Sequence, residues 1–178
     1  IRAERSRDRL FLLPPGEAAA PPETGLCAPG KTRFGEYVFT AAAESPGGKL
    51  GDGVRCQALD MDKLRGAVVR TRQAGDTFRL LDGSGTAALK ELLISRRVDR
   101  PFRDMLPLLA RGREILWAPG AGPSLTAAVT PETKAVAMIT LEGPMPWVEI
   151  PGGEQGGQPE GGHDLGGESD AFRGAARR

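Results

Sequence analysis

The residues of this chain that could carry chemistry are mainly its arginines and lysines. Between residues 63 and 113 there are twelve Lys or Arg against five Asp or Glu, so this segment carries a formal charge of +7, although all 178 residues together carry only +1. A guanidinium presents a planar fork of N–H donors that matches the oxygens of a phosphate. The segment is therefore a candidate phosphate-binding surface. The simpler alternative is a solvated face whose charges are balanced by acids elsewhere in the fold.

Four arginines stand at the predicted end of a helix and in the turn after it, where they can converge on one surface. Contacts of this kind fix a protein's position on a nucleic acid but carry little sequence information. An RNA helix would be held mainly through its backbone shape, because its deep groove excludes side chains. The predicted phosphate contacts, which include these four, are Arg70, Arg72, Arg79, Lys90, Arg96, Arg97, Arg100 and Arg103.

Other kinds of site are poorly supported by the sequence. His163 is the single histidine and lies in a glycine-rich segment, which offers no ligand set for zinc. Neither cysteine nor any serine has a histidine base within the predicted folded segment, which argues against nucleophilic catalysis. The glycine loop at residues 83–85 lacks the spacing of a P-loop and is interpreted as a turn before a helix. We therefore predict no catalytic residue, no cofactor and no metal in this chain.

The cysteines and the hydropathy pattern bear on the compartment. Cys27 and Cys56 are far apart and form no CxxC pair, which suits a reducing environment, while a single disulfide stays open as an alternative. No apolar run approaches the roughly 18 residues that cross a membrane. Charged residues follow Ile1 at once, which is unlike a signal peptide, and an opening Ile suggests a fragment. These features predict a cytoplasmic protein with no membrane contact.

Asp76 and the large apolar residues have both functional and structural interpretations. Asp76 could orient an arginine toward phosphate, but its place after a glycine favours the capping of a turn through its own backbone. Trp147 lies before the glycine-rich tail and could cover an edge of the domain. The residues expected in the core, rather than on a base-stacking surface, are Phe78, Leu80, Leu81 and Trp117.

Short strands and one or two helices are expected to position these residues. Leu89, Leu92 and Leu93 recur at helical spacing, so residues 86–95 are predicted to form a helix with Thr86 as its N-cap. A second short helix is expected over residues 102–105, after Pro101. The expected strands are residues 34–40, 54–59, 67–72 and 135–141, a single strand within residues 2–13, and a hairpin of 107–109 with 114–118 that turns at Arg111 and Gly112.

This pattern predicts an α+β fold of mostly antiparallel sheets over residues 34–142. Residues 1–33 are expected to be a partly ordered linker, because residues 14–31 are rich in Pro, Ala and Gly. Residues 143–178 are expected to be a disordered tail, because almost no apolar residue follows residue 152.

In order and spacing, these pieces resemble the C-terminal domain of bacterial tRNA(Ile)-lysidine synthetase. No single piece is specific to this family, but their order and spacing along residues 34–141 are fairly specific. The pieces that carry the resemblance are Arg70-x-Arg72-x-x-Gly75-Asp76-x-Phe78, Leu89-Lys90-Glu91, Arg96-Arg97-Val98, Arg100, Arg103-Asp104, Leu106-Pro107-Leu108, the EILW of residues 114–117 and the VTPET of residues 129–133.

The resemblance implies a function for the chain. In that family an N-terminal PP-loop domain uses ATP and Mg to activate the wobble cytidine of tRNA(Ile), which lysine then attacks. The C-terminal domain is β-sandwich-like, is similar to a module of phenylalanyl-tRNA synthetase, and helps recognise the tRNA near its acceptor stem. The SGGxDS-type nucleotide motif is absent from this chain. The chain alone is therefore expected to bind tRNA(Ile) and its catalytic N-terminal domain, and to be inactive, whereas the parent enzyme is an ATP-dependent ligase.

The sequence departs from the family's pattern at positions where the family often has a basic residue or a conformationally restricted proline. Ala87 and Ala88 precede the predicted helix, Thr77 follows the Gly-Asp pair, and Asp99 stands where proline is usual. The stretch after Gly120 also lacks its usual basic residue. These changes support an alternative, a structural module that packs on the catalytic domain and contacts little RNA. An autonomous enzyme is the least supported alternative, because no catalytic constellation is present.

Overall fold

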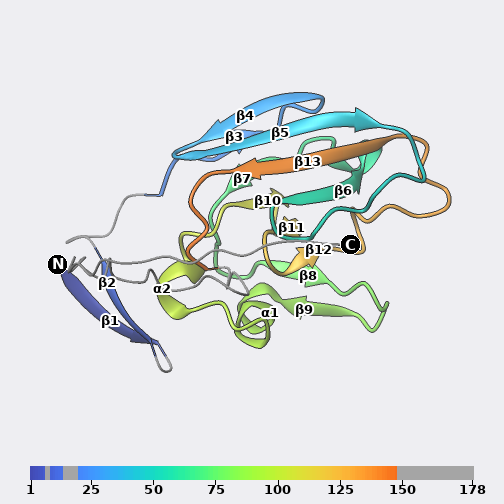
Figure 1. The fold of residues 1–178 in the computed structure, drawn as a ribbon. Coiled ribbons are helices and arrows are strands. Elements are labelled where there is room, and N and C mark those ends of the chain that lie inside the picture. Colours follow the sequence, from blue (N-terminus) through green and yellow to red (C-terminus); the bar gives the residue numbers. More distant parts are fainter. Residues whose placement is uncertain (7–8, 14–19, 148–178) are drawn as a thin grey trace, which may run out of the picture.

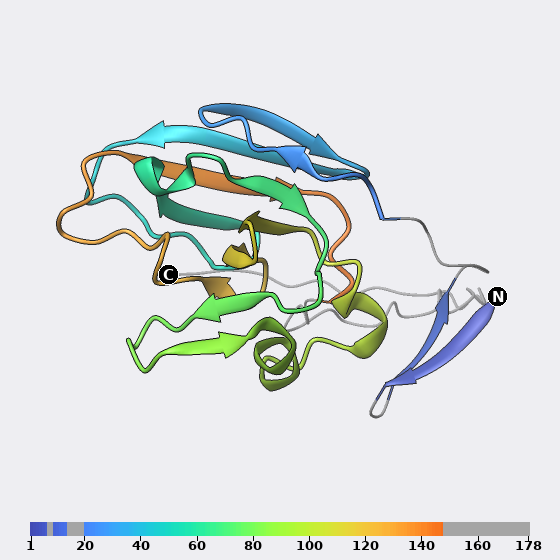
Figure 2. The same cartoon turned by 180° about the vertical axis from the view of Figure 1, so that it is seen from behind.

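Two β-sheets lie face to face, and the helices cover the outer face of one of them (Figures 1 and 2). The structure is a computed structural model, and it describes residues 1–6, 9–13 and 20–147. We call the three layers the outer sheet, the central sheet and the helix layer. A separate two-stranded hairpin lies beside the helix layer.

The outer sheet has four antiparallel strands in the order β4, β5, β13, β6. A two-residue turn joins the first two strands, because Phe34 pairs with Tyr37. The strand predicted over residues 135–141 is confirmed and lies at the middle of this sheet. The bounds are β4 (Gly30–Phe34), β5 (Tyr37–Glu44), β6 (Cys56–Asp60) and β13 (Val136–Glu142).

The central sheet has seven strands in the order β3, β7, β10, β11, β8, β9, with β12 pairing beside β11. The predicted hairpin of β10 and β11 is confirmed. All pairings are antiparallel except that of β11 with β8. The bounds are β3 (Thr24–Gly25), β7 (Val68–Arg70), β8 (Thr77–Arg79), β9 (Thr86–Ala88), β10 (Leu108–Arg111), β11 (Glu114–Ala118) and β12 (Gly122–Pro123).

The parallel pairing of β8 with β11 determines the path of residues 71–76. Strands β7, β11 and β8 all run in the same direction, since β10 is antiparallel to both β7 and β11. The chain that leaves the end of β7 must therefore return along the sheet before β8 begins. We call residues 71–76 the crossover loop.

The helix layer contains α1 (Leu89–Ser95) and α2 (Arg100–Arg103), and a 3-10 helix, η1 (Met61–Leu64), follows β6. Leu89, Leu92 and Leu93 are buried, as the spacing predicted. The prediction of Thr86 as the N-cap is wrong. Thr86 pairs with Arg79 across β8 and β9, and the cap position is Ala88, which provides no side-chain hydrogen bond.

The middle of the central sheet is buried on both faces, so strands β7, β10 and β11 each contribute to two hydrophobic cores. Along β10, Leu109 faces the outer sheet while Leu108 faces the helices, as alternation along a strand requires. In β11, Trp117 belongs to the core between the sheets, and Ile115 belongs to the core under the helices. Burial on both faces explains why the EILWA segment is apolar at consecutive positions.

Residues 1–13, for which one strand was predicted, contain two. Strands β1 (Arg2–Ser6) and β2 (Arg9–Leu13) form an antiparallel hairpin. Phe11 packs edge-on against Phe102 of α2, with ring centroids 5.0 Å apart, whereas Leu10 and Leu12 are exposed. Odd and even positions of a strand point to opposite sides, so one side of the hairpin is bound to α2 and the other is open.

The described structure moves the boundaries of the domain. The predicted linker of residues 1–33 includes β3 and the start of β4, because Leu26 N–H donates to Ala67 O at 2.9 Å and Cys27 N–H donates to Thr32 Oγ1 at 2.8 Å. At the other end, Trp147 is buried against Tyr37. The sheets therefore involve residues from about 24, and packing continues to residue 147. The remainder of the predicted tail lies outside the described residues.

The α+β fold of mostly antiparallel sheets with two short helices is confirmed. Phe78 and Trp117 are buried in the two cores, and Leu80 packs against the core under the helices. Leu81, which was predicted to be a core residue, is 54% exposed. It lies in the turn between β8 and β9, which is closed by a hydrogen bond from Leu80 N–H to Gly85 O at 2.9 Å, so neither core reaches it.

Candidate nucleic-acid interface

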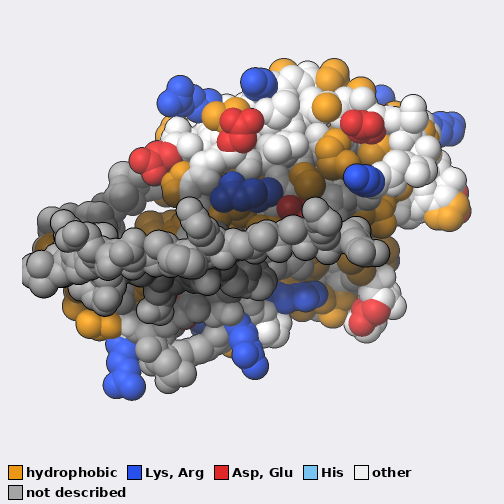
Figure 3. All heavy atoms as spheres, viewed as in Figure 1, with side chains coloured by type: hydrophobic (Ala, Val, Ile, Leu, Met, Phe, Trp, Pro, Cys, Tyr) orange, Lys and Arg blue, Asp and Glu red, His pale blue; other side chains and the backbone are white. Residues whose placement is uncertain are grey.

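The helix layer presents a set of basic side chains to solvent. Figure 3 shows Lys and Arg side chains projecting from the lower edge of the molecule, which is the helix side in Figure 1. Three come from α1 and its C-terminal end, two from α2 and one from the crossover loop. They are Lys90, Arg96, Arg97, Arg100, Arg103 and Arg72.

Helix α1 separates its apolar and polar residues as the sequence predicts. Its leucines face the central sheet, and Lys90 and Ile94 lie one turn apart on the exposed side. Arg97 follows the end of the helix and is also exposed.

The turn that ends α1 places an arginine in a backbone conformation that is rare for residues other than glycine. Arg97 adopts a left-handed conformation with φ of 59°. Its N–H donates to Ile94 O at 3.0 Å, and Val98 N–H donates to Leu93 O at 3.0 Å. This is the hydrogen-bond pattern of a Schellman motif, in which glycine is the usual residue at the left-handed position. The turn reverses the chain and directs it into α2.

The apolar residues of helix α2 pack inward, toward the core under the helices. Pro101 and Phe102 are buried, and Arg100 and Arg103 come from its two ends. Arg103 is half-buried and donates from Nε to Val98 O at 2.8 Å, which ties α2 to the end of α1. The arginines of the two helices are therefore parts of one connected structure.

Arg72 connects the crossover loop to this set. Its Nε donates to Asp104 Oδ1 at 2.9 Å, and its terminal nitrogen contacts the same oxygen. Asp104 directly follows α2 and is largely exposed. Since an exposed ion pair of this kind contributes little stability, the pair mainly fixes where the guanidinium lies.

Arg70 must be removed from the predicted set. It is 2% exposed, and its guanidinium makes a bidentate pair with Asp76, with N–O distances of 2.8 and 2.9 Å. It also donates to Gly112 O at 2.7 Å and Thr71 O at 2.9 Å. A phosphate cannot reach donors that are buried and already paired. Asp76 accordingly has the structural role that the sequence favoured.

Arg79 is exposed, but it lies apart from the others. It alternates with Phe78 along β8, and Phe78 faces the core under the helices, so Arg79 is directed to the opposite face. Along the strand edge, its backbone bonds to Ser124 Oγ and to the N–H of Leu125, in the segment after β12. The structure thus brings together six of the eight predicted contacts.

Acidic residues lie among the six basic ones. Glu91 is exposed on α1, Asp104 pairs with Arg72, and Asp99 is buried at the N-cap of α2. Residues 89–104 contain five basic and three acidic residues, so their formal charge is +2. The interface is therefore basic through the exposed position of its arginines rather than through a large excess of charge.

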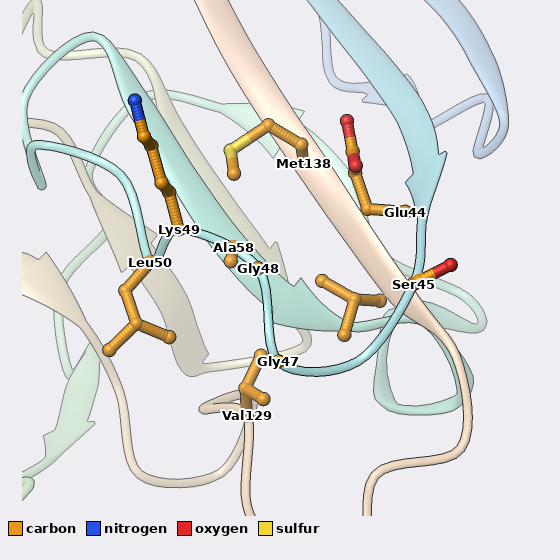
Figure 4. Close-up of a pocket in the computed structure, with 10 residues that line it drawn as sticks. Glu44, Ser45, Gly47, Gly48, Lys49, Leu50, Ala58, Val129 and Met138 are labelled. Carbon is orange, nitrogen blue, oxygen red and sulfur yellow. The ribbon is translucent and has the colours of Figure 1, made fainter.

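The structure offers no competing site of clear chemistry. Among the described residues there is no group of three His, Cys, Asp or Glu side chains that could hold a metal. A hollow of about 290 Å³ lies on the outer sheet, in a different layer from the arginines, and Figure 4 shows Met138 and Val129 beside the loop that carries Lys49 and Leu50. Its lining is largely aliphatic and contains no candidate catalytic pair.

In the described part of the chain, none of the helices has the length and apolar character needed to cross a membrane.

The fold and the basic helix layer define a sheet-rich domain with a candidate nucleic-acid interface, and comparison with known proteins shows what this domain resembles. Residues 67–140 match the family model described as the TilS substrate C-terminal domain. This match covers most of the segment on which the resemblance rests, so the resemblance predicted from its motifs is confirmed.

Curated relatives agree with this assignment. A tRNA(Ile)-lysidine synthase of Caldanaerobacter subterraneus subsp. tengcongensis is 41% identical over 82 residues, which is 46% of this chain and 18% of that protein. One from Clostridium perfringens is 31% identical over 110 residues, which is 62% of this chain and 24% of that protein. The chain thus spans about a quarter or less of the length of these relatives.

A solved structure supports the fold. The crystal structure of a TILS C-terminal domain superimposes with a TM-score of 0.56 and 23% identity, covering 68% of this chain and 95% of that chain.

Proposed function

We propose that this chain is the tRNA-recognition part of a cytoplasmic tRNA(Ile)-lysidine synthase. Its helix layer would contact the phosphate backbone of tRNA(Ile) at the acceptor stem. A catalytic domain outside this chain would use ATP and Mg to ligate lysine to the wobble cytidine. The observation that carries the proposal is the set of six basic side chains that α1, α2 and the crossover loop bring to one layer.

The geometry suits backbone contact more than base reading. The basic side chains stand on a helix layer whose leucines and Phe102 are packed inward, and neither α1 nor α2 presents an exposed aromatic side chain for base stacking. Contacts from arginine to phosphate fix the register of the bound RNA, while base identity is read elsewhere. Such a domain would increase the affinity of the whole enzyme for tRNA and orient it toward the catalytic domain.

The test is a salt titration of tRNA(Ile) binding by the 178-residue chain, beside an unrelated tRNA. Each phosphate contact contributes about one to the slope of log affinity against log salt. Neutralising Arg96, Arg97, Arg100 and Arg103 together should lower the magnitude of that slope by about 3 to 4 and weaken binding. An unchanged slope would refute the role of the helix layer.

A matched control removes the same charge from the outer sheet. Four exposed basic residues, two in β4 and two in the loop between β5 and β6, can be changed to glutamine without touching the helix layer: Lys31, Arg33, Lys49 and Arg55. If net charge alone drives binding, this variant will lose as much affinity as the first. The proposal expects it to retain most of the salt slope.

A second candidate function is a packing module that binds the catalytic domain and contacts little RNA. It is favoured by the open side of the β1–β2 hairpin, where Leu10 and Leu12 are 67% and 69% exposed. Exposed apolar side chains on one strand face are suited to another protein surface. This candidate predicts negligible RNA binding by the chain alone but association with the separately produced catalytic domain, which Leu10→Ser with Leu12→Ser would weaken.

A further inference from the structure

Arg113 lies at the tip of the β10–β11 hairpin, outside the set of residues predicted to bind RNA. It follows Gly112 at the turn, and its carbonyl accepts from Thr77 N–H at 2.9 Å, which fixes its backbone at the start of β8. Its guanidinium lies across the crossover loop at Gly75. A Cβ added to Gly75 would stand 2.9 Å from Nη1 of Arg113 and 3.6 Å from its Cζ.

The charge of Arg113 has no carboxylate partner among the described residues. Asp76 is occupied by Arg70, and Glu114 lies 3.7 Å from Arg111 and accepts from Thr126. The Arg113 side chain is exposed, unlike that of Arg70. Its donors are therefore available to an anion from solution.

The crossover loop joins Arg113 to the helix layer. At one end, Arg72 contacts Asp104 beside α2, and at the other, Gly75 lies under Arg113. Residues 73–75 between them are all exposed and include only one long side chain, Gln73. A loop with small side chains lets a bulky polymer approach its backbone closely.

The buried ion pair makes this loop a firm support. Asp76 Oδ2 accepts from Gln73 N–H at 2.8 Å, and Arg70 donates to Thr71 O from below. Arg70 also reaches Gly112 O, so the same guanidinium ties the crossover loop to the hairpin tip that carries Arg113. The exposed surface from Arg72 to Arg113 is thus held by the Arg70–Asp76 pair beneath it.

We infer that the RNA-binding surface continues from the helix layer along the crossover loop to Arg113, and that Arg113 binds a backbone phosphate of duplex RNA at the far end of this surface. The inference rests on the proposed function. Duplex RNA presents phosphates along its length, so contacts at both ends of the surface would fix the direction in which the helix lies across the domain.

The experiment compares Arg113→Ala with wild type in the 178-residue chain, using a fluorescent RNA hairpin that reproduces the acceptor stem of tRNA(Ile). The expected result is a salt slope lower in magnitude by about one and a roughly tenfold weaker affinity at 50 mM salt. Lys31→Ala, an exposed lysine of β4, is the matched control and should change neither quantity.

A second variant tests the geometry rather than the charge. Gly75→Ala should displace the guanidinium and weaken binding to a similar extent, and adding it to Arg113→Ala should cause little further loss. Gly83→Ala is its control, because Gly83 also has a positive φ of 74° but nothing within 4 Å of an added Cβ. It should strain its turn without affecting RNA. Additive losses in the double variant would show that Gly75 does not act through Arg113.

The outcomes separate the inference from the proposed function. If the helix-layer variant loses binding while Arg113→Ala keeps the wild-type slope, the extension to Arg113 is overturned and the proposed function stands. If the wild-type chain does not bind the hairpin at all, both are overturned. Thermal unfolding of each variant verifies that losses in binding do not come from unfolding.

Discussion

Arg70 and Asp76 form a buried ion pair beneath the crossover loop, with side chains 3% and 1% exposed. Removing two charges from water is costly, and the cost is offset only where every donor and acceptor is satisfied. Here the guanidinium meets both carboxylate oxygens and two carbonyls, while the carboxylate also accepts from the backbone of Gln73. The main role of the pair is therefore to fix the position of the crossover loop.

Breaking this pair should be much more costly than breaking the exposed one. Asp76→Ala leaves the buried guanidinium with only the more exposed carboxylate of Glu23, 3.8 Å away, and should lower the free energy of unfolding by about 3 to 5 kcal/mol. Arg72→Ala removes an exposed pair and should cost at most about 1 kcal/mol. Urea denaturation measures both. A double variant, Arg70→Met with Asp76→Leu, should be less destabilised than Asp76→Ala, and the opposite order would contradict this account.

Asp60 makes the stability of the protein depend on pH in the acidic range. Burial raises the pKa of its carboxyl, but the hydrogen bond from Thr133, 2.8 Å long, and the charge of Lys63 outweigh burial, so the pKa lies below its ordinary value of 3.8. A carboxyl whose pKa is lower in the folded state contributes stability above its unfolded pKa and loses it as the pH falls through the folded pKa.

The expected outcome is a specific loss of stability below about pH 4. Asp60→Asn should have a lower free energy of unfolding than wild type at pH 6, and the difference should shrink as the pH falls toward 2. Denaturation curves at several pH values measure this. Thr133→Val removes one cause of the lowered pKa, so the stability of this variant should fall less than that of wild type as the pH is lowered. A difference in free energy of unfolding between Asp60→Asn and wild type that stays constant across the pH range would refute the role of Asp60.

At the scale of elements, the turn between α1 and α2 determines how the arginines are presented. The Schellman hydrogen bonds end α1 at Ser95, and Leu93 and Val98, which lie on either side of the turn, are both buried in the core under the helices. This apolar contact across the motif is typical of it. The arginine at the left-handed position carries conformational strain that glycine would not.

Arg97→Gly should therefore keep or raise stability while it removes one charge. The left-handed conformation costs a side-chain-bearing residue roughly 1 to 2 kcal/mol, and the added freedom of glycine in the unfolded chain offsets part of the relief. Arg97→Val should be destabilised by about 1 to 2 kcal/mol. Thermal unfolding compares them. If glycine proved less stable than arginine, the contacts of the Arg97 side chain would outweigh the strain.

The β1–β2 hairpin depends on one aromatic contact with the helix layer. Phe11→Ala removes the packing on Phe102, so the amides of residues 2–13 should exchange with solvent faster. The amides of β13, at the middle of the outer sheet, should keep their protection. Hydrogen exchange measures both sets, and Leu12→Ala, which alters an exposed side chain, is the control. Unchanged exchange in the hairpin would show that other contacts hold it.

At the scale of the whole molecule, the three layers are joined where the two cores meet. Tyr37 and Met145 pack against both cores, and Trp147 belongs to the core under the helices. The ring centroids of Tyr37 and Trp147 are 5.9 Å apart. Residues after β13 therefore connect the outer sheet to the helix layer, and the described layers should unfold as one cooperative unit.

Trp147 allows a clean test of this connection. Its indole Nε1 is buried and has no hydrogen-bond partner among the described residues. Trp147→Phe removes this unsatisfied donor and should change the free energy of unfolding by less than about 1.5 kcal/mol, whereas Trp147→Ala leaves a cavity and should cost about 3 to 5 kcal/mol. Chemical denaturation measures both. Equal costs for the two variants would mean that the indole nitrogen, rather than packing, is what the site needs.

Much of the architecture followed from local patterns. The leucine spacing of α1, the apolar run of β13 and the turn between β10 and β11 each depend on residues close in sequence, so periodicity and turn chemistry were sufficient to predict them. Strand β3 was not predicted, and β4 was predicted only at Phe34, because these strands are stabilised by partners outside their own segment, such as Ala67 for Leu26. Thr86 was misjudged for the same reason, since its partner is Arg79.

The sequence by itself determined the fold class, the family resemblance and the concentration of positive charge between residues 63 and 113. Only the tertiary structure decided which of those charges face solvent. Arg70 and Arg96 are equivalent as residue types, yet one is buried on Asp76 and on Gly112, which is 42 positions away, and the other is exposed at a helix end. Burial and pairing depend on contacts between distant segments, and local sequence does not contain them.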